Sequence, residues 1–499
     1  MKPAQPAASA SVWPPLVALA AIALGLAFRF YVVSLPIETL TSRYLADDYF
    51  YYLNVAHHIA SGSGSTFDGG LTRTNGYQPL FLGMLVASFE AGVDKLSAIR
   101  IGLAIQAVAC AAAALAAHLL MARRGAAWAG ALAAGLLSLN LFFVLPTLTG
   151  FEMALALAGL LWALWCWETH KPPLVVGGLC GLAALARVDT LVLPLLLAVI
   201  MLKRRQARDL IRFGGAALAV VAPWAVWSAV RFGSPFPDSG LVKVQYRGVE
   251  AIGRSLTLAF HELPRVVVPG RVVDAAMARG PVVLAAIACV LLLVAIREAV
   301  RAPNRGLSAV ALCIAAAYAS LVDAGEPGAL VRYLFPVWAI LVLLCAQSRW
   351  VQTWWVVGLC LAAHAADIGV YRRWERTAPV QRTYVSVSQA VANDILGPRL
   401  AEGLLIGSFD GGALGYFAPR PIVNLDGLAN HDIVQLRRDC RRPRAQCLRE
   451  YMTGKGVRVL AGGTAFGWTR ELPDWRRWER LYESPPLADG STLVVLRLP

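Results

Sequence analysis

Two adjacent carboxylates, Asp47 and Asp48, stand where the first apolar run of the chain ends, in the stretch RYLADDYFYYLNVAHHIASGSG (43–64). Like charges this close raise the pKa of one carboxyl group, which suits a general base. The same pair could share a divalent cation (Mg²⁺, Mn²⁺ or Ca²⁺), so the chain needs either no cofactor or one such ion. An ordinary helix N-cap is the alternative, because Asp is favourable at the start of a helix.

Tyrosines crowd the two acids, and aromatic side chains prefer the membrane interface. The residues that follow form an imperfect apolar stripe, which predicts a helix over 48–61 lying along the membrane surface. The next segment, TFDGGLTRTNGYQPL (66–80), is rich in turn formers and is either an ordinary loop or the lining of a substrate cleft. Our candidate substrate contacts in this region are Tyr52, Asn75, Tyr77 and Gln78.

Three further charged residues adjoin or interrupt apolar segments. Glu152, in TGFEM, stands at the start of an apolar run, where a helix N-terminus would tolerate an acid. Arg187 and Asp189 interrupt an otherwise apolar stretch, and charges at such places are costly and usually paired or functional. We therefore take Glu152 and Asp189 as candidate substrate contacts.

Two basic residues are candidates for binding a phosphate. Arg332 precedes the substrate candidate Tyr333 at the start of another apolar run, where it either snorkels to the interface or binds phosphate through two hydrogen bonds. Lys243 lies in the loop FGSPFPDSGLVKVQYRG (232–248) and is the second candidate.

The composition identifies the broad class of protein. The chain has 499 residues, of which 58% are apolar and 15% charged, and its mean hydropathy is +0.57. Soluble domains carry about 25% charged residues. Apolar runs of about twenty residues match the thickness of a bilayer, so we expect a polytopic α-helical membrane protein. The net charge of +15 then requires no nucleic-acid partner, because basic cytoplasmic loops produce the same balance.

The apolar runs predict about eleven membrane spans, with the run 78–92 too short to cross and better suited to a re-entrant or interfacial helix. With the N-terminus inside, the predicted cytoplasmic loops are rich in Lys and Arg, as the positive-inside rule requires. The acids and turn-forming segments then face the exterior. The predicted spans are 13–34, 97–121, 126–147, 150–168, 173–187, 189–202, 211–231, 281–297, 306–323, 329–347 and 351–370.

A change of composition near residue 375 divides the chain into a transmembrane domain, 1–374, and an exterior α/β domain, 375–499. The first exterior loop, 35–96, belongs to the former. Short β-like runs at 403–409, 420–427, 457–463 and 491–498 alternate with helical stretches near 383–396 and 430–452. Cys440 and Cys447 flank a polar loop of this region, and a disulfide between them is plausible if the region is outside the cytoplasm.

The order of several motifs resembles the GT-C superfamily of membrane glycosyltransferases. The motifs are DDYFYYLNVAHHIASGSGSTFDGGLTRTNGYQPL, TGFEMALALAGLLWAL, LAALARVDTLVLP, RFGSPFPDSGLVK and VRYLFPVWAI, followed by IGSFDGGALGYFAPRPIVNLDGLANHDI near the C-terminus. Within the superfamily, the chain looks most like the polyprenyl-phosphate-sugar-dependent branch that contains mycobacterial-type terminal arabinofuranosyltransferases. Lipid A aminoarabinose transferases and protein O-mannosyltransferases are more distant relatives.

The resemblance implies a hexosyl- or pentosyltransferase in the inner membrane, with its active site and C-terminal domain facing the periplasm or exterior. The donor would be a polyprenyl-phosphate sugar and the acceptor a hydroxyl of a cell-envelope glycan, lipid or protein. Asp47 falls on the position of the general base, with Asp48 in the second acidic place, and some members hold a metal nearby. Lys243, Arg332 and Arg187 would bind the donor phosphate.

Two departures from the branch concern the donor: Asp238 stands where Asn is usual, and Arg187-Val188-Asp189 replaces Arg-Pro-Glu. Two other functions fit a chain with many spans. One is a transporter or lipid flippase, which predicts charges near mid-membrane and inverted repeats. The other is a ligase that transfers a whole lipid-linked glycan.

Overall fold

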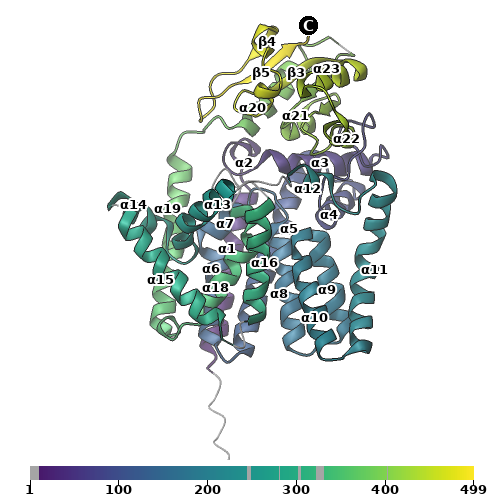
Figure 1. Ribbon diagram of the computed structural model, residues 1–499. Coiled ribbons are helices and arrows are strands. Elements are labelled where there is room, and N and C mark those ends of the chain that lie inside the picture. The colour runs from purple at the N-terminus through teal and green to yellow at the C-terminus, as the bar shows by residue number, and fades with distance from the viewer. Residues whose placement is uncertain (1–10, 244–248, 280, 302–304, 322–330, 402) are drawn as a thin grey trace, which may run out of the picture.

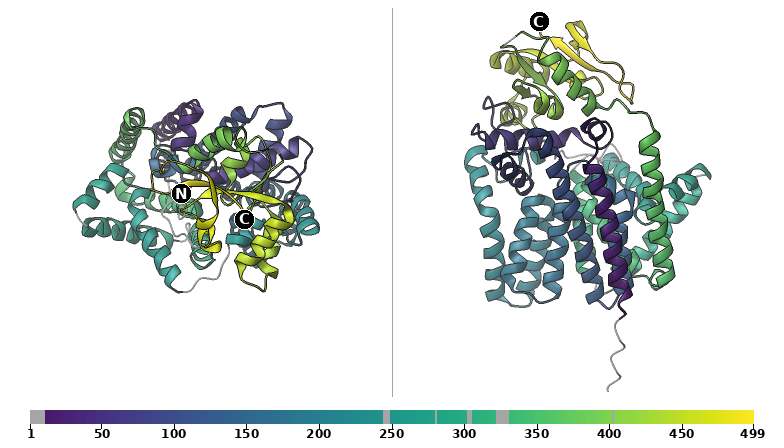
Figure 2. Two further views of the ribbon diagram at one scale, coloured as in Figure 1. Left: turned by 90° about the horizontal axis from the view of Figure 1, so that it is seen from above. Right: turned by 180° about the vertical axis from the view of Figure 1, so that it is seen from behind.

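A bundle of long helices carries a small α/β part on one of its ends (Figure 1). The computed structural model describes residues 11–243, 249–279, 281–301, 305–321, 331–401 and 403–499. The views from above and from behind place the α/β part over the ends of the helices (Figure 2). The chain between α1 (Trp13–Val33) and α5 (Lys95–Arg123) lies between the two parts, where it separates the bundle from the α/β part.

The helices of the bundle follow the predicted apolar runs closely. Capping explains some of their ends: the Asp94 side chain accepts hydrogen bonds from the N–H groups of Leu96 and Ser97 where α5 begins, and Gly233 adopts a left-handed φ of +71° where α11 ends. The remaining elements are α2 (Ile37–Arg43), α3 (Asp47–Ala60), α4 (Pro79–Glu90), α6 (Ala127–Leu139), α7 (Leu141–Thr147), α8 (Met153–Glu168), α9 (Pro173–Ala186), η1 (Val188–Leu191), α10 (Val192–Lys203), α11 (Ala207–Phe232), α12 (Asp238–Lys243), α13 (Val249–Glu262), η2 (Leu263–Val266), α14 (Gly270–Arg279), α15 (Pro281–Ala299), α16 (Arg305–Leu321), α18 (Phe335–Ala346), η4 (Arg349–Val351) and α19 (Trp354–Thr377).

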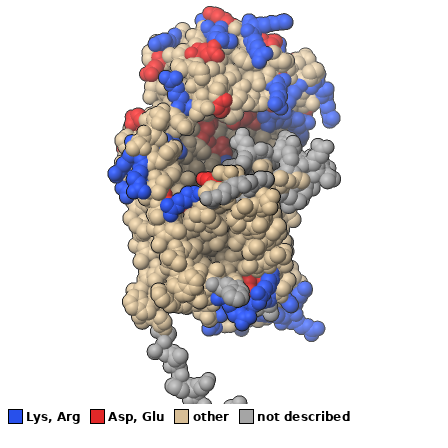
Figure 3. All heavy atoms as spheres, turned by 90° about the vertical axis from the view of Figure 1, so that its left-hand side faces the viewer, with Lys and Arg blue, Asp and Glu red and all other residues tan. Residues whose placement is uncertain are grey.

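Four helices of the described residues, α1, α5, α11 and α19, are long and apolar enough to cross a membrane, and the bent pair α6–α7 would make a fifth. Four shorter apolar helices accompany them, namely α4, α8, α9 and α18. On the face drawn in Figure 3, a band across the bundle is almost free of charged side chains, and Lys and Arg gather at the end away from the α/β part. The total of about eleven spans stays a prediction.

The predicted span 126–147 corresponds to two helices, α6 and α7, which a bend of 49° separates. Arg29 of α1 is buried beside the bend and donates hydrogen bonds to the carbonyl oxygen of Ser138 (2.9 Å) and to the hydroxyl of Thr147 (3.1 Å). Asn140, between the two helices, donates to the carbonyl oxygens of Arg265 and Val266. Side chains thus bind the polar groups that the bend leaves buried, as an apolar environment requires.

The helix α3 begins one residue before its predicted range, but it does not lie on a lipid surface as expected. All residues from Tyr49 to Ala56 are buried. The ring of Tyr49 stacks with that of Phe81 in α4. The ring of Phe50 packs against Tyr416 and Phe417 of the α/β part. The tyrosines around the acids therefore fill an interface between two parts of the protein instead of a membrane interface.

The α/β part is a five-stranded mixed sheet with the strand order β2-β1-β3-β5-β4. Strand β1 pairs in parallel with β2 and β3, whereas β5 runs antiparallel to β3 and β4. Successive side chains of a strand point to opposite faces of the sheet, and here both faces are apolar. Val459 and Val495 belong to one buried cluster, and Leu460 and Val494 belong to the other. The strands are β1 (Leu405–Ser408), β2 (Ile422–Asn424), β3 (Val457–Gly463), β4 (Glu479–Glu483) and β5 (Leu493–Arg497).

Helices cover both faces of this sheet, with α20 and α21 packed in the first cluster and α22, α23 and α24 in the second. Four predicted strands are confirmed, and so are both helical stretches, although 430–452 is divided into two helices. The edge strand β4 was missed, because its sequence ERLYE is mostly charged and partly exposed. The helices are α20 (Tyr384–Val391), η5 (Ala392–Leu396), α21 (Gly412–Phe417), α22 (His431–Asp439), α23 (Arg444–Lys455), α24 (Trp468–Glu471) and η6 (Trp475–Arg477).

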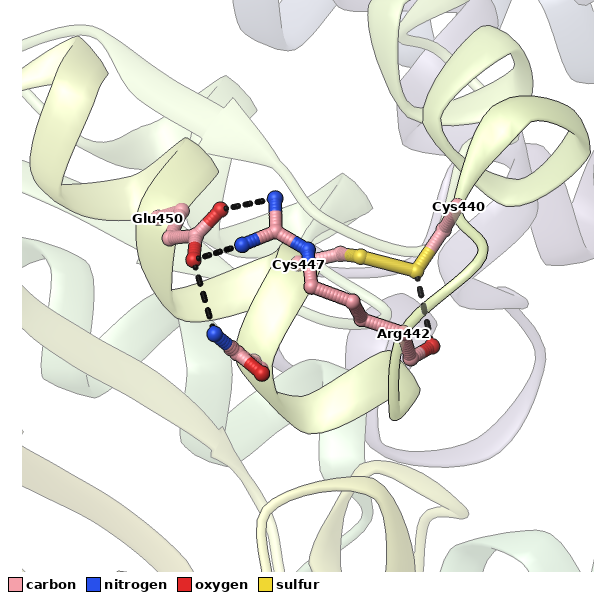
Figure 4. Close-up of a disulfide and its surroundings, with 5 residues drawn as sticks. Cys440, Arg442, Cys447 and Glu450 are labelled. Atoms are coloured by element: carbon pink, nitrogen blue, oxygen red, sulfur yellow. Dashed lines mark hydrogen bonds and ion pairs between the residues drawn. A yellow bond between two sulfur atoms is a disulfide. The ribbon is translucent and has the colours of Figure 1, made fainter.

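A disulfide joins Cys440, at the end of α22, to Cys447 of α23 (Figure 4). Beside it, the guanidinium of Arg442 donates to both carboxylate oxygens of Glu450, at 2.7 and 2.8 Å. The disulfide and this ion pair together brace the short connection between the two helices.

One carboxylate connects the α/β part to the bundle. Asp47, the first residue of α3, accepts hydrogen bonds of 2.8 Å from the N–H groups of both Gly412 and Ala413, at the start of α21. Tyr51, one turn further along α3, donates to Asp426 (2.9 Å) and accepts from the N–H group of Gly411 (2.9 Å). The first N–H groups of a helix have no partner within the helix, so the start of α21 supplies both donors that the oxygens of the buried Asp47 side chain need.

The close contact between α3 and α21 predicts that one added methyl group at Gly412 lowers the stability of the protein. A Cβ atom on Gly412 would lie 2.2 Å from the carbonyl oxygen of Asp47. We expect Gly412→Ala to destabilise the docked state by about 1–3 kcal/mol, the usual cost of overpacking. Thermal unfolding and limited proteolysis after α19 would measure the loss. The matched control is Gly454→Ala on α23, where a Cβ has no neighbour within 4 Å; equal effects of both substitutions would contradict the prediction.

The same contact predicts a dependence on pH. Burial raises the pKa of Asp47 from 3.8 to about 8, although the N–H groups of Ala413 and Gly412 act in the opposite direction. Between these two pH values the folded protein holds a proton that the unfolded chain releases, so stability falls as the pH rises.

We expect melting temperatures of the wild type to fall between about pH 5 and pH 8 more steeply than those of Asp47→Asn, which cannot titrate. Identical slopes for the two proteins would refute the role of Asp47 in this dependence.

Candidate functional site

A cavity of about 530 Å³ lies where the bundle, the first loop region and the α/β part meet. Figure 3 shows a hollow at this level of the molecule with Asp and Glu side chains at its depth. Its walls come from segments far apart in the sequence. The predicted site residues that line it are Asp48, Tyr52, Tyr77, Gln78, Glu152, Arg187, Asp189, Arg332 and Tyr333.

The two adjacent acids have different surroundings. Asp47 does not line the cavity, and both of its oxygens accept N–H groups of α21. Asp48 lines the cavity, and its side chain is 26% exposed. Successive residues of a helix point about 100° apart, so the docking of Asp47 onto α21 turns Asp48 toward the cavity.

Arg332 is the cationic partner of Asp48. Its Nη1 donates to Oδ2 of Asp48 at 2.7 Å, and its guanidinium lies 3.5 Å from the ring centroid of Phe151. The Nε atom of Arg332 is buried and has no hydrogen-bond partner among the described residues. Buried polar atoms are almost always satisfied, so a donor left over beside a cavity indicates a place for a ligand oxygen.

A second network forms another wall of the cavity. Nη1 of Arg187 donates to Glu152 at 2.8 Å, and Nη2 donates to Asp189 at 3.0 Å. Tyr52 donates to the other oxygen of Glu152 at 3.1 Å, and the N–H group of Gln78 donates to the Tyr52 hydroxyl. These charges are mutually paired, which lowers the cost of their burial.

Three of the predicted site residues, Asp47, Asn75 and Lys243, are not among the described side chains that line the cavity. Asp47 binds α21, as described above. Asn75 is fully buried and instead joins its loop to α11 and α12, donating to the hydroxyl of Ser228 (2.7 Å) and accepting from the N–H group of Asp238 (3.1 Å). Lys243 ends α12, and its side chain lies outside the described part of the structure.

Asp238, the departure from the expected Asn, is buried and accepts a hydrogen bond from Nδ1 of His431 at 2.7 Å. Burial raises the pKa of Asp238, and His431 partly offsets that effect. The pair ties α12, which forms one wall of the cavity, to α22 of the α/β part.

Some lining residues were not predicted. The segment around Ser239 to Leu241 forms one wall, and Leu428 and Ala429 of the α/β part form another. The latter two belong to the C-terminal motif that carried the family resemblance, so that motif was the available signal. Phe151, under the Arg332 guanidinium, stands beside Glu152 in TGFEM and carried no signal of its own.

The shared cation expected between Asp47 and Asp48 finds little support in the residues present. The oxygens of Asp47 already accept backbone N–H groups, which point hydrogen atoms at the place a cation would take. Within the described ranges, no group of three or more His, Cys, Asp or Glu side chains could hold a metal ion. We therefore derive no chemical step through a metal.

A second cavity, of about 320 Å³, adjoins the first at Arg332. Its lining is mainly apolar and comes from α7, the start of α8 and α19. Members of this lining are Leu141, Phe142, Leu145, Pro146, Met153 and Tyr371. Arg332 therefore lines both cavities, of which the first also contains the side chains of Asp48, Glu152 and Asp189.

Comparisons with known proteins relate the chain to two groups of solved structures. Residues 377–495 match a family model described as a domain of unknown function, DUF8728. A comparison with curated proteins finds no match. ArnT from Cupriavidus metallidurans bound to undecaprenyl phosphate is similar, with 15% identity, a TM-score of 0.56 and 98% of each chain covered. Its apo form gives 14% identity, a TM-score of 0.59 and 97% coverage of each chain.

The archaeal oligosaccharyltransferase AglB from Archaeoglobus fulgidus, in complex with an inhibitory peptide and a dolichol-phosphate, is also similar. The identity is 12% and the TM-score 0.54, with 98% of this chain and 76% of that chain covered. Identities this low bear on the fold alone. The resemblance seen in the sequence is confirmed at that level, and the chain is a multi-pass membrane protein with the GT-C fold.

Proposed function

We propose that the protein is a glycosyltransferase that moves one sugar from a polyprenyl-phosphate donor to a hydroxyl of a cell-envelope glycan, lipid or protein. The observation that carries the proposal is the contact between Asp48 and Arg332 inside the large cavity. It places a carboxylate able to take a proton beside a guanidinium able to hold a phosphate. The similarity to structures bound to undecaprenyl phosphate and dolichol-phosphate supports the same donor class.

The two adjoining cavities fit the two ends of such a donor. The mainly apolar second cavity suits the first isoprene units, and the first cavity, which contains the acids and tyrosines, suits the sugar. Arg332 lies between them, where the phosphate joins lipid to sugar. Its unpartnered Nε could donate to one phosphate oxygen, and the guanidinium offers further N–H groups for a second oxygen.

Arrival of the donor would change the partner of Arg332. In the structure its Nη1 binds Asp48, and a phosphate that recruits this group would leave the carboxylate free to accept a proton. Asp48 then takes the proton of the acceptor hydroxyl while that oxygen attacks the anomeric carbon. The bond between this carbon and the phosphate oxygen breaks, and polyprenyl phosphate leaves as an anion held by Arg332.

This mechanism assigns the base to Asp48, whereas the sequence motif places it at Asp47. The geometry favours Asp48, because Asp47 has both oxygens bound to α21 and does not line the cavity. Glu152 and Asp189 line the cavity but are paired with Arg187, and their side chains are less exposed than that of Asp48. We assign these two acids and Tyr52 to holding the sugar or the acceptor.

The proposed setting is the inner membrane, with the cavity and the α/β part on the periplasmic or exterior side. The basic end of the bundle lies away from the α/β part, as the positive-inside rule would require. The disulfide in the α/β part supports an oxidising compartment.

The base assignment is tested by comparing two isosteric substitutions. We expect Asp48→Asn to lower kcat for sugar transfer by about 10²–10⁴-fold, the usual contribution of a general base. Asp47→Asn should retain transfer, reduced only as far as docking weakens. The assay follows sugar transfer from a defined polyprenyl-phosphate donor by mass spectrometry. Loss of transfer in Asp47→Asn with retention in Asp48→Asn would return the base to Asp47.

The phosphate site is tested at Arg332. We expect Arg332→Gln to weaken binding of polyprenyl phosphate by about 10–100-fold, because a hydrogen bond to a charged group contributes about 1.5–3 kcal/mol. Arg100→Gln is the control, since Arg100 donates to the carbonyl oxygen of Leu35 and lines neither cavity. Unchanged affinity in Arg332→Gln, measured by competition with the donor, would exclude this phosphate site.

A further inference from the structure

A third cavity, of about 320 Å³, lies apart from the two described above and shares no lining residue with them. It is formed by the loop after α3 and by the last turns of α11. The loop supplies polar groups, and α11 supplies an arginine and two aromatic rings. Those that bear on its chemistry are Ser63, Arg73, Trp227, Arg231 and Phe232.

The charge of this cavity is positive and uncompensated. Arg73 and Arg231 are both exposed, and neither has an ion-pair partner among the described residues. The acid of the same loop, Asp68, is fully buried and its oxygens accept from Thr66 and Thr72 instead. The lining of the cavity includes two arginines and no carboxylate, a composition that suits a phosphate group.

The position of the cavity on α11 indicates where its ligand would come from. This helix is long and apolar enough to cross a membrane, and only 11% of its apolar window is buried inside the protein. Val226 and Val230, in the same turns as Trp227 and Arg231, are 60% and 77% exposed. Figure 1 shows α11 at the edge of the bundle, with its last turn next to the α/β part.

The last turns of such a helix lie at the level of lipid head groups. A helix of 26 residues is about 39 Å long, more than the roughly 30 Å of hydrocarbon it must cross. Trp227 has the location typical of aromatic residues at a membrane interface. We propose that this cavity binds the phosphate of an anionic membrane phospholipid through Arg73 and Arg231.

The cavity adjoins the loop that lines the main cavity, so a bound head group would brace that loop. Ser65, another lining residue, donates to the carbonyl oxygen of Thr74 (2.5 Å) and lies 2.8 Å from the hydroxyl of Tyr77. Thr74 and Tyr77 line the main cavity. Binding therefore predicts a gain of thermal stability that depends on the lipid.

The test uses the full chain, purified in detergent and depleted of lipid, with its melting temperature measured in micelles containing phosphatidylglycerol or phosphatidylcholine. We expect phosphatidylglycerol to raise the melting temperature of the wild type above its value in phosphatidylcholine. Arg73→Gln/Arg231→Gln should lose this lipid-dependent rise, and Arg73→Lys/Arg231→Lys should keep part of it. Native mass spectrometry should show fewer retained phosphatidylglycerol molecules on the Gln double variant.

The matched control is Arg208→Gln/Arg212→Gln, which removes the same charge from the opposite end of α11. This control variant should keep the lipid-dependent rise of the melting temperature. An equal loss of the rise in the control would show that phosphatidylglycerol is attracted unspecifically by positive charge, and it would overturn the proposal. Retention of the full rise by Arg73→Gln/Arg231→Gln would overturn it as well. If inorganic phosphate or glucuronate stabilised the wild type and phosphatidylglycerol did not, the ligand would be a soluble anion, and the lipid assignment would be wrong.

The Gln double variant must match the wild type in phosphatidylcholine to show that it is folded. If it unfolds, Arg231→Gln alone serves, because this side chain is exposed in the last turn of its helix. A partial loss of the lipid-dependent rise would then support the proposal, and an unchanged rise would refute it. None of these measurements depends on sugar transfer, so the lipid site and the proposed function are tested independently of each other.

Discussion

The hydrogen bonds between the Asp47 carboxylate and the start of α21 determine how the rest of the site is arranged. A helix start offers N–H groups without partners, and a buried carboxylate needs donors, so each satisfies the other. The contact joins two regions that lie more than 360 residues apart in the chain. Because all three residues lie on the helix α3, fixing Asp47 on one side also fixes the direction in which Asp48 and Tyr52 point.

The charged side chains of the main cavity are paired, because an unpaired charge is costly where little water is present. Arg187 lies between Glu152 and Asp189, and Arg332 binds Asp48, so each cation in the cavity wall has an anionic partner. The two sets differ in how easily they can exchange partners. The Arg187 network is more deeply buried and is held by Tyr52 as well, whereas Arg332 adjoins both cavities and retains an unpartnered Nε. A phosphate can therefore compete for Arg332 with less disturbance of the surrounding packing.

Much of the architecture could be predicted because it depends on local patterns. The apolar runs became helices at the expected places, and the apolar strands of the C-terminal part formed the predicted sheet elements, since hydrophobic periodicity is a property of consecutive residues. Where a local pattern was weak or ambiguous, the prediction failed. The charged edge strand β4 has no apolar alternation, and the tyrosines of α3 fit a membrane interface as well as they fit an interface between two parts of the protein.

The sequence by itself determined that the chain is a helical membrane protein, that acids and arginines gather near the ends of its apolar segments, and that its motifs follow the GT-C order. The tertiary structure decided which of these residues meet. It brought Asp48 to Arg332 and Glu152 to Arg187, and it withdrew Asp47 and Asn75 into contacts between elements. Neighbouring residues on one helix have nearly the same sequence context but face different surroundings. Which of two adjacent acids faces a cavity therefore depends on the distant segment that packs against the helix, and spacing along the chain carries no record of that segment.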